Sequence, residues 1–99
     1  MPSLREIASR AFGSAAGSGG YVVVFSQTCP HCHTLFEQLG FQMTPGQITQ
    51  QDNIVFVNFD QLPRSDQTTI RGVPDIKFYE AGRPTRAVSR EELLQAINL

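Results

Sequence analysis

Two short runs of β-branched and aromatic residues most constrain the fold of this chain. They are Tyr21–Phe25 and Ile54–Phe59, and such nearly continuous apolar runs are typical of strands buried on both faces. Between the runs, four apolar side chains recur at helical spacing, and they are Cys32, Leu35, Phe36 and Leu39. Two buried strands joined through a helix require a parallel crossover. The pattern therefore predicts an α/β sandwich, in which a mixed β-sheet of about four strands is flanked by helices.

Capping residues mark the starts of the helices. Ser3 with Glu6 and Ser89 with Glu92 form capping boxes, which predict helices near the two ends of the chain. Thr28 is placed to cap the helix that follows the first strand, because a hydroxyl there can accept a hydrogen bond from a free backbone amide. The expected order of elements is α-β-α-β-α-β-β-α.

The remaining segments carry weaker signals. We expect a short polar helix over Pro63–Ile70, and strands over Ile76–Tyr79 and Pro84–Val88 that form an antiparallel hairpin around a short turn. The glycine- and serine-rich stretch Gly13–Gly20 is expected to be a flexible connection. A candidate helix start at Thr44 leaves residues 44–53 open between helix and loop.

Size and charge limit the function classes. The chain has 99 residues and a net charge of −1, which predict one domain over residues 1–99 and offer no basic face for nucleic acid or a membrane surface. Arg5, Glu6 and Arg10 interrupt the apolar stretch that a signal peptide needs. We therefore expect a cytoplasmic protein that acts as a monomer and binds neither membrane nor nucleic acid.

The segment Cys29-Pro30-His31-Cys32 follows a predicted buried strand and opens a predicted helix. A thiol attacks disulfides as the thiolate, which the positive end of a helix favours. This placement makes Cys29 the attacking thiol and Cys32, one turn on, the resolving thiol. Pro30 fixes φ in the first turn, and a protonated His31 would place positive charge beside the thiolate. The two residues are the candidates for tuning the thiolate.

Three other interpretations fit the same letters. Cys29 to His33 also matches the attachment pattern of c-type haem, with His33 as axial ligand, but haem attachment would need an export signal. A metal site would join His31 or His33 to both cysteines, which falls short of the four ligands of structural zinc. Inert core cysteines would not favour a Pro-His pair at a helix start. We therefore expect no metal and no cofactor beyond a redox-active disulfide between Cys29 and Cys32.

The motifs in the second half of the chain are similar to those of the thioredoxin family. Asn58–Pro63 resembles the segment that ends the family's strand after the active-site helix, and Ile70–Pro74 with Phe78–Gly82 resembles its cis-proline loop and hairpin turn. Cys29 and Cys32 match its redox pair. The resemblance implies a thioredoxin-like sandwich that performs disulfide exchange.

The resemblance also implies a substrate groove. It would be formed by the active-site loop with Thr28, by the loop at Val73 and Pro74, and by the residues before the last helix. A cis Val73–Pro74 bond is expected, so that Val73 offers its backbone to an extended substrate beside Cys29. Asp75 follows directly. Its negative charge would disfavour the Cys29 thiolate if it lay nearby, although a solvated carboxylate in the loop is the simpler interpretation.

Several positions depart from the family pattern. Thr28 replaces the usual tryptophan, and Pro30-His31 is the centre familiar from the DsbA family of disulfide-forming proteins. The family's buried aspartate corresponds to Val23, and the strand lysine near it to Val57. These departures predict a redox pair more oxidising than ordinary thioredoxin.

The expected function is thiol–disulfide exchange with protein thiols and disulfides, with a reductase or glutathione as the recycling partner. One alternative is a redox-inert adaptor that uses the scaffold to bind a protein. Another is a glutathione-coupled, glutaredoxin-like enzyme. However, Ser26 stands where glutaredoxins often carry a basic residue, and no glycine–aspartate pair follows Pro74.

Overall fold

A computed structural model describes residues 3–13, 15–40, 49–51 and 53–97. The strands are β1 (Gly19–Phe25), β2 (Thr49–Gln51), β3 (Ile54–Asn58), β4 (Asp75–Glu80) and β5 (Arg83–Ala87). The helices are α1 (Leu4–Phe12), α2 (Pro30–Leu39), α3 (Arg64–Gln67) and α4 (Arg90–Ile97), with a 3-10 turn, η1, at Phe59–Gln61. Among the described residues, no helix has the length and apolar character needed to cross a bilayer.

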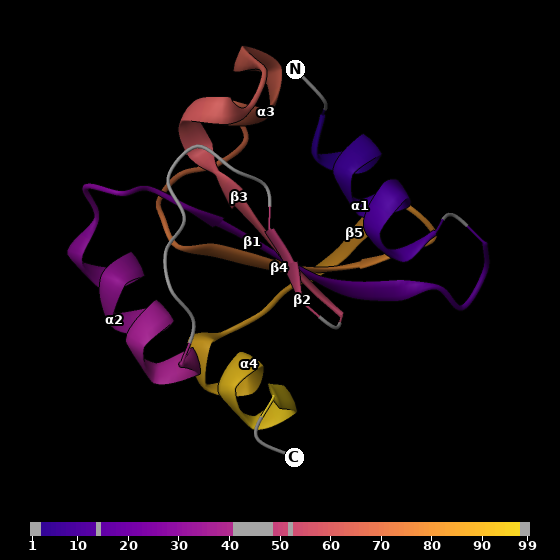
Figure 1. The fold of residues 1–99 in the computed structure, drawn as a ribbon. Coiled ribbons are helices and arrows are strands. Elements are labelled where there is room, and N and C mark those ends of the chain that lie inside the picture. The colour runs from indigo at the N-terminus through magenta and orange to yellow at the C-terminus, as the bar shows by residue number, and fades with distance from the viewer. Residues whose placement is uncertain (1–2, 14, 41–48, 52, 98–99) are drawn as a thin grey trace.

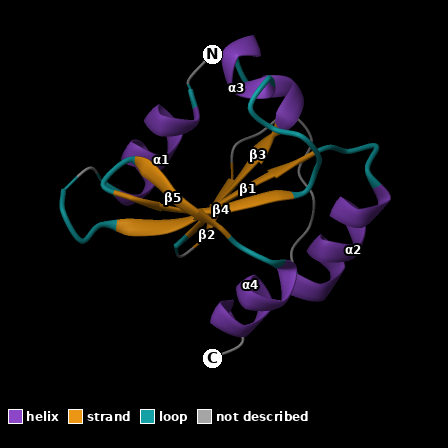
Figure 2. Ribbon diagram, turned by 180° about the vertical axis from the view of Figure 1, so that it is seen from behind, coloured by secondary structure: helices purple, strands orange, loops and turns teal. Residues whose placement is uncertain are grey.

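The elements form three layers around one mixed sheet. The strand order is β2-β3-β1-β4-β5, with β1 parallel to β3 and antiparallel to β4. Helices α1 and α3 lie on one side of the sheet, and α2 and α4 lie on the other (Figures 1 and 2). The predicted α/β sandwich is confirmed, and so are the parallel crossover and the terminal β4–β5 hairpin.

Side chains of β1 alternate between two hydrophobic clusters, one on each face of the sheet. Tyr21, Val23 and Phe25 belong to the cluster under α2 and α4, whereas Val22 and Val24 belong to the cluster under α1. All five are at most 9 % exposed. A strand that is covered on both faces needs apolar residues at every position. This double burial accounts for the uninterrupted apolar run.

The sheet has a fifth strand that the sequence does not signal. Strand β2 pairs antiparallel with β3, with Thr49 opposite Phe56 and Gln51 opposite Ile54. Three polar residues have no apolar alternation, so no strand pattern marks them. The candidate helix start at Thr44 lies outside the described residues.

The connection before β1 is shorter than expected, because its last two glycines belong to the strand. Gly19 pairs with Glu80, and Gly20 pairs with Tyr79. A Cβ at Gly20 would lie 2.6 Å from the Asn53 carbonyl oxygen and would also overlap the ring of Phe12. Glycine is therefore required by close packing here.

Helix starts follow the capping boxes at both ends of the chain. The Glu6 amide donates to Ser3 Oγ at 3.2 Å, and the Glu92 amide donates to Ser89 Oγ at 3.1 Å. Helix α3 is shorter than predicted because Ile70, at the end of the expected range, closes a turn in which its amide donates to the Gln67 carbonyl.

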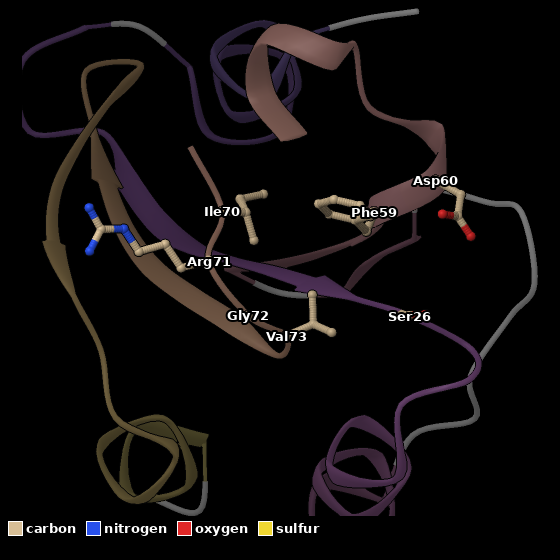
Figure 3. A pocket seen from close by; sticks show the side chains of 7 residues that line it. All are labelled: Ser26, Phe59, Asp60, Ile70, Arg71, Gly72 and Val73. Atoms are coloured by element: carbon tan, nitrogen blue, oxygen red, sulfur yellow. The ribbon is translucent and has the colours of Figure 1, made fainter. Parts of the chain in front are cut away.

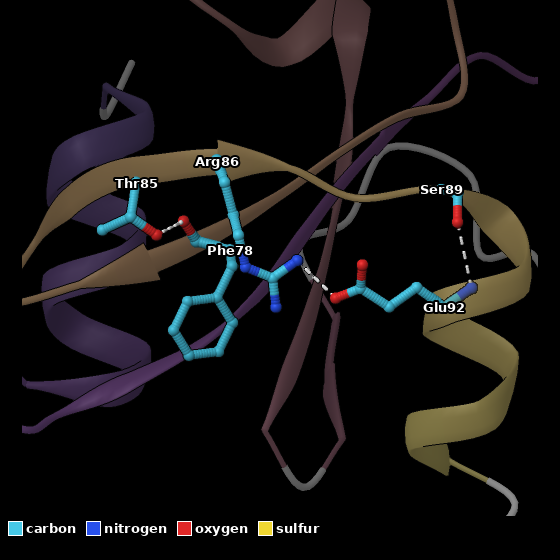
Figure 4. A network of polar contacts seen from close by, with 5 residues as sticks. All are labelled: Phe78, Thr85, Arg86, Ser89 and Glu92. Carbon is cyan, nitrogen blue, oxygen red and sulfur yellow. Dashed lines mark hydrogen bonds and ion pairs between the residues drawn. The ribbon is translucent and has the colours of Figure 1, made fainter.

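The terminal hairpin is tied to α4 by a small polar network. Arg86 forms an ion pair with Glu92 and lies 5.5 Å from the centre of the Phe78 ring (Figure 4). Thr85 Oγ1 donates to the Phe78 carbonyl at 2.9 Å. The predicted strand is displaced by one residue: it ends at Ala87, and Val88 turns into the core.

We predict that Gly20→Ala lowers the free energy of unfolding by about 1–3 kcal/mol, the usual cost of overpacking. Gly72→Ala is the matched control, because a Cβ there meets no atom within 4 Å and its φ is not in the left-handed range. The control should stay within about 0.5 kcal/mol of the wild type. Chemical denaturation measures both variants, and equal stabilities would contradict the packing argument.

Candidate active site at the start of α2

Cys29 is the N-cap residue of α2. Its carbonyl oxygen accepts hydrogen bonds from the amides of Cys32 at 3.1 Å and His33 at 3.2 Å. The prediction that Thr28 caps this helix is therefore wrong. Thr28 lies one residue too early, and its hydroxyl pairs instead with Ser26 Oγ at 3.1 Å. The helix begins without a side-chain cap, and the positive end of its dipole lies at Cys29.

The two cysteines are free thiols with different surroundings. Cys29 is half-buried, whereas Cys32 is 0 % exposed in the cluster under α2 and α4. Burial raises the pKa of Cys32 from its ordinary value of 9.0 to about 12. A hydrogen bond from the Ser26 backbone lowers this pKa, and contact with the Cys29 sulfur raises it. At neutral pH the buried thiol is thus protonated.

Cys29 meets the loop at Val73 and Pro74, which lies far away in the sequence. The Cys29 thiol donates to the Val73 carbonyl oxygen at 3.4 Å, and the Val73–Pro74 peptide bond is cis. Val73 is half-buried and packs against both hydrophobic clusters. The Val73 backbone therefore lies directly beside the exposed edge of the dithiol.

Asp75 is the first residue of β4 and is not a loop residue. Its carboxylate lies 3.6 Å from Lys77 Nζ, and both side chains are about a quarter exposed, at 23 % and 27 %. Side chains alternate along a strand. Since Ile76 faces the cluster that contains Cys32, Asp75 points to the opposite face. This geometry gives no support to the repulsion between Asp75 and the Cys29 thiolate that the sequence left open, and the favoured interpretation as a solvated loop carboxylate is also wrong, because Asp75 lies in a strand beside Lys77.

The residues between the cysteines lie at the surface. Pro30 occupies the first position of α2, where its ring suits the helical φ and no amide donor is needed. Both Pro30 and His31 are exposed. His31 is therefore free to bring positive charge to the start of the helix when it is protonated.

His33 makes a contact that sequence reasoning did not foresee. Its Nε2 donates to the Gln27 carbonyl oxygen at 2.6 Å; the oxygen can only accept, so this nitrogen carries the hydrogen. The partners are six residues apart, which matches no helical side-chain spacing. As a result, no sequence signal could have found the contact.

A shallow pocket of about 380 Å³ lies beside Val73. It is lined by Ser26, Phe59, Asp60, Ile70, Arg71, Gly72 and Val73. Phe59 and Ile70 point into it, while the charged ends of Asp60 and Arg71 lie at opposite ends (Figure 3). Of this lining, the sequence singled out Val73 as a groove residue. The pocket joins three separate segments, residues 26, 59–60 and 70–73, and no sequence pattern shows that they meet.

The positions that depart from the thioredoxin pattern are apolar and buried. Val23 and Val57 are both 0 % exposed. The register pairs Val23 with Phe56, which shares its cluster, whereas Val57 lies in the cluster on the opposite face. The residue next to Val23 is thus Phe56, and the expectation that Val57 lies near it is wrong. Within the described part of the chain, no group of three or more histidine, cysteine or acidic residues is arranged to hold a metal ion.

We predict that Cys32 alone behaves as a poor nucleophile at neutral pH. In Cys29→Ser, the cause that contributes most to its raised pKa, burial, remains. Alkylation by iodoacetamide should therefore accelerate about tenfold per pH unit from neutral pH to about pH 9, as the thiolate fraction grows. Cys32→Ser, which keeps the half-buried thiol, is the control and should react faster at neutral pH. A rate that levels off below pH 9 would contradict the role of burial.

Comparisons with known proteins agree with this architecture. No model of a known protein family and no curated protein matches the chain. Among solved structures, Trxlp from Edwardsiella tarda EIB202 is 25 % identical, with a TM-score of 0.55 over 85 % of both chains. The Malassezia sympodialis thioredoxin Mala s 13 is 17 % identical, with a TM-score of 0.61 over 99 % of this chain and 85 % of its own. The oxidised thioredoxin of Plasmodium falciparum is 16 % identical, with a TM-score of 0.54 over 95 % and 86 %. The chain has the thioredoxin fold.

Proposed function

We propose that this protein is a thiol–disulfide oxidoreductase that exchanges electrons with protein thiols and disulfides through Cys29 and Cys32. One observation carries the proposal. A half-buried thiol sits at the N-cap of α2, a fully buried thiol lies one turn further on, and a backbone carbonyl from a distant loop contacts the first of them. This is the asymmetry that a two-step exchange reaction requires.

In the reducing direction, the Cys29 thiolate attacks one sulfur of a substrate disulfide. A bond forms between Cys29 Sγ and that sulfur, and the other substrate sulfur leaves as a thiolate. Cys32 then attacks Cys29 Sγ, which forms the Cys29–Cys32 disulfide and releases the second substrate sulfur. The substrate gains two electrons, the protein pair loses two, and the proton of Cys32 ends on the departing sulfur. The reverse sequence oxidises a substrate dithiol.

The substrate groove runs along Val73 and Pro74. The Val73 backbone beside Cys29 suits an extended peptide, since a strand-like segment presents its own amides and carbonyls at regular intervals. Thr28 forms the rim on the α2 side, and the apolar floor of the pocket at Phe59 and Ile70 suits a substrate side chain. Asp75, which starts β4, contributes to the groove through its backbone.

The redox pair is more oxidising than that of ordinary thioredoxin. The positive end of the α2 dipole lies at Cys29, and a protonated His31 would add positive charge there, an arrangement that suits an anion. Val23 supplies no buried carboxylate whose negative charge would disfavour a thiolate. The negative charge of Asp75 is offset by Lys77. A potential is set by how strongly the thiolate form is stabilised relative to the disulfide.

We place this activity in the cytoplasm, in one domain that spans residues 1–99 and acts as a monomer. The disulfide itself serves as the redox group, so no metal or organic cofactor takes part. A reductase or glutathione returns the pair to the dithiol, as the exposed rim at Thr28 and Pro30 leaves room for either.

We expect the two cysteines to differ in trapping experiments. Cys32→Ser should accumulate stable mixed disulfides through Cys29, because the resolving thiol is gone. Cys29→Ser should trap almost nothing, because the remaining thiol is buried and protonated. Each variant is incubated with a reduced and with an oxidised model protein. Non-reducing electrophoresis then measures the mixed disulfides formed in the oxidising and in the reducing direction of the exchange.

Two outcomes would contradict the proposal. Equal trapping by the two variants would show that Cys29 and Cys32 do not have separate attacking and resolving roles. Absence of trapping by both, together with a Cys29 thiol no more reactive than free glutathione, would favour the redox-inert adaptor instead.

The potential of the pair is a separate prediction. Equilibration with reduced and oxidised glutathione should give a value tens of millivolts above the roughly −270 mV of thioredoxin. His31→Gly should lower the potential toward thioredoxin, by about 30 mV for each tenfold change in the equilibrium constant. Gln38→Ala, on the exposed side of the same helix, is the control. A wild-type potential at or below that of thioredoxin would refute the oxidising assignment.

A further inference from the structure

We propose that His33 is a positioning residue of the active site: its imidazole holds the loop of residues 26–28 against α2 so that Cys32 can complete the exchange reaction. This inference rests on the proposed function, and it assigns a residue beyond the Cys-Pro-His-Cys segment. His33 does not touch the reacting sulfurs. It acts through the loop that touches one of them.

His33 makes two bonds at this end of α2, one to the loop and one to the N-cap residue. The imidazole Nε2 donates to the Gln27 carbonyl oxygen at 2.6 Å, and the backbone amide donates to the Cys29 carbonyl oxygen at 3.2 Å. Neutral imidazole with hydrogen on Nε2 and protonated imidazole can both make the first bond. The contact therefore needs no change of protonation, and it bridges a loop residue to the second turn of α2.

Short-range contacts shape the loop of residues 26–28. The Cys29 amide donates to the Ser26 carbonyl oxygen at 3.2 Å, which closes a turn over Gln27 and Thr28. Ser26 Oγ pairs with Thr28 Oγ1 at 3.1 Å. All these bonds lie within the turn itself. The imidazole of His33 adds a bond from α2 to Gln27 of this turn, beside the hydrogen bond between the Ser26 backbone and Cys32.

The turn carries the group that assists the buried thiol. The Ser26 backbone hydrogen-bonds Cys32 and favours its thiolate, against the larger effect of burial. Only a donor stabilises a thiolate in this way, so the backbone amide is the group involved. If the turn drifts from the helix, this hydrogen bond weakens, and Cys32 loses the support that its surroundings give to the charged sulfur.

The affected reaction is the second half of the exchange. In the mixed disulfide, the Cys32 sulfur attacks Cys29 Sγ, the Cys29–Cys32 bond forms, and the bond to the partner sulfur breaks. The partner leaves reduced and takes up the proton that Cys32 gives up. The first half depends on Cys29 and on the positive end of the helix, which His33→Ala leaves in place. Loss of the imidazole should thus slow the second half selectively.

The test uses Ellman's disulfide, 5,5′-dithiobis(2-nitrobenzoate), with the reduced full-length chain in a stopped-flow instrument. Attack by Cys29 releases one thionitrobenzoate in a phase that depends on reagent concentration. Attack by Cys32 releases the second in a phase that does not. His33→Ala should slow the second phase about fivefold, the factor that one ordinary hydrogen bond carries, and leave the first within about twofold.

Two further variants separate positioning from a general loss of helix structure. His33→Gln keeps an N–H donor at a similar reach and should restore the second phase. Thr34→Ala removes a different side-chain bond of α2, from Thr34 Oγ1 to the Pro30 carbonyl oxygen at 3.1 Å, and should change neither phase. An unchanged second phase in His33→Ala would overturn the proposal, as would equal slowing in Thr34→Ala or no rescue in His33→Gln.

The readout also separates this inference from the proposed function. If the wild-type first phase is no faster than that of free glutathione, Cys29 is not an activated nucleophile and the oxidoreductase assignment fails. The second phase still reports in that case whether His33 supports Cys32, because the reagent forms the mixed disulfide with any accessible thiol.

Discussion

The whole site depends on the burial of β1 on both faces. A strand that is covered on each side needs a helical layer above and below it, and the chain supplies α1 on one side and α2 and α4 on the other. The parallel pairing with β3 and the antiparallel pairing with β4 then fix what lies at each end of β1. The end of β1 is next to the start of β4, with Val24 opposite Asp75. Cys29 and Val73 meet because both lie just beyond that pair.

The same arrangement separates the environments of the two cysteines. One helical turn carries the chain from the edge of the sheet to the interior, so Cys29 keeps contact with solvent while Cys32 packs among Val23, Leu35 and Phe56. Burial is the largest influence on the Cys32 thiol. The different roles of two identical side chains thus follow from their depth in the fold.

Local patterns in the sequence were sufficient for the frame of the molecule. The strands β1 and β3, the hairpin and both capping boxes were predictable because each depends on residue period or on neighbours within a few positions. The two cysteines were predictable as the reactive pair, because their spacing and their position directly after a buried strand together indicate a redox site.

Features that depend on distant contacts were not predictable in the same way. Thr28 has the chemistry of a helix cap, but the turn closed by Ser26 moves the helix start to Cys29. Strand β2 exists because β3 offers it a free edge, and its polar residues give no pattern of their own. The pocket beside Val73 and the bond from His33 to Gln27 join residues from separate elements. For Val57, one residue of register decided which face of the sheet it occupies.

The apolar surroundings of Cys32 also decide where its proton goes. Among the described residues, Asn58 is the polar side chain that is buried, and its amide oxygen is occupied by the Asp60 amide at 3.0 Å. The described core therefore holds no buried carboxylate to accept a proton from the resolving thiol. The base that remains is the leaving sulfur, which becomes a thiolate at the moment when the Cys29–Cys32 bond forms. A good leaving thiolate is a poor base and takes up this proton weakly. A backbone hydrogen bond that stabilises the negative charge on the Cys32 sulfur therefore assists the reaction. The rate of the second step therefore depends on the position of the loop of residues 26–28 and on His33, which binds it.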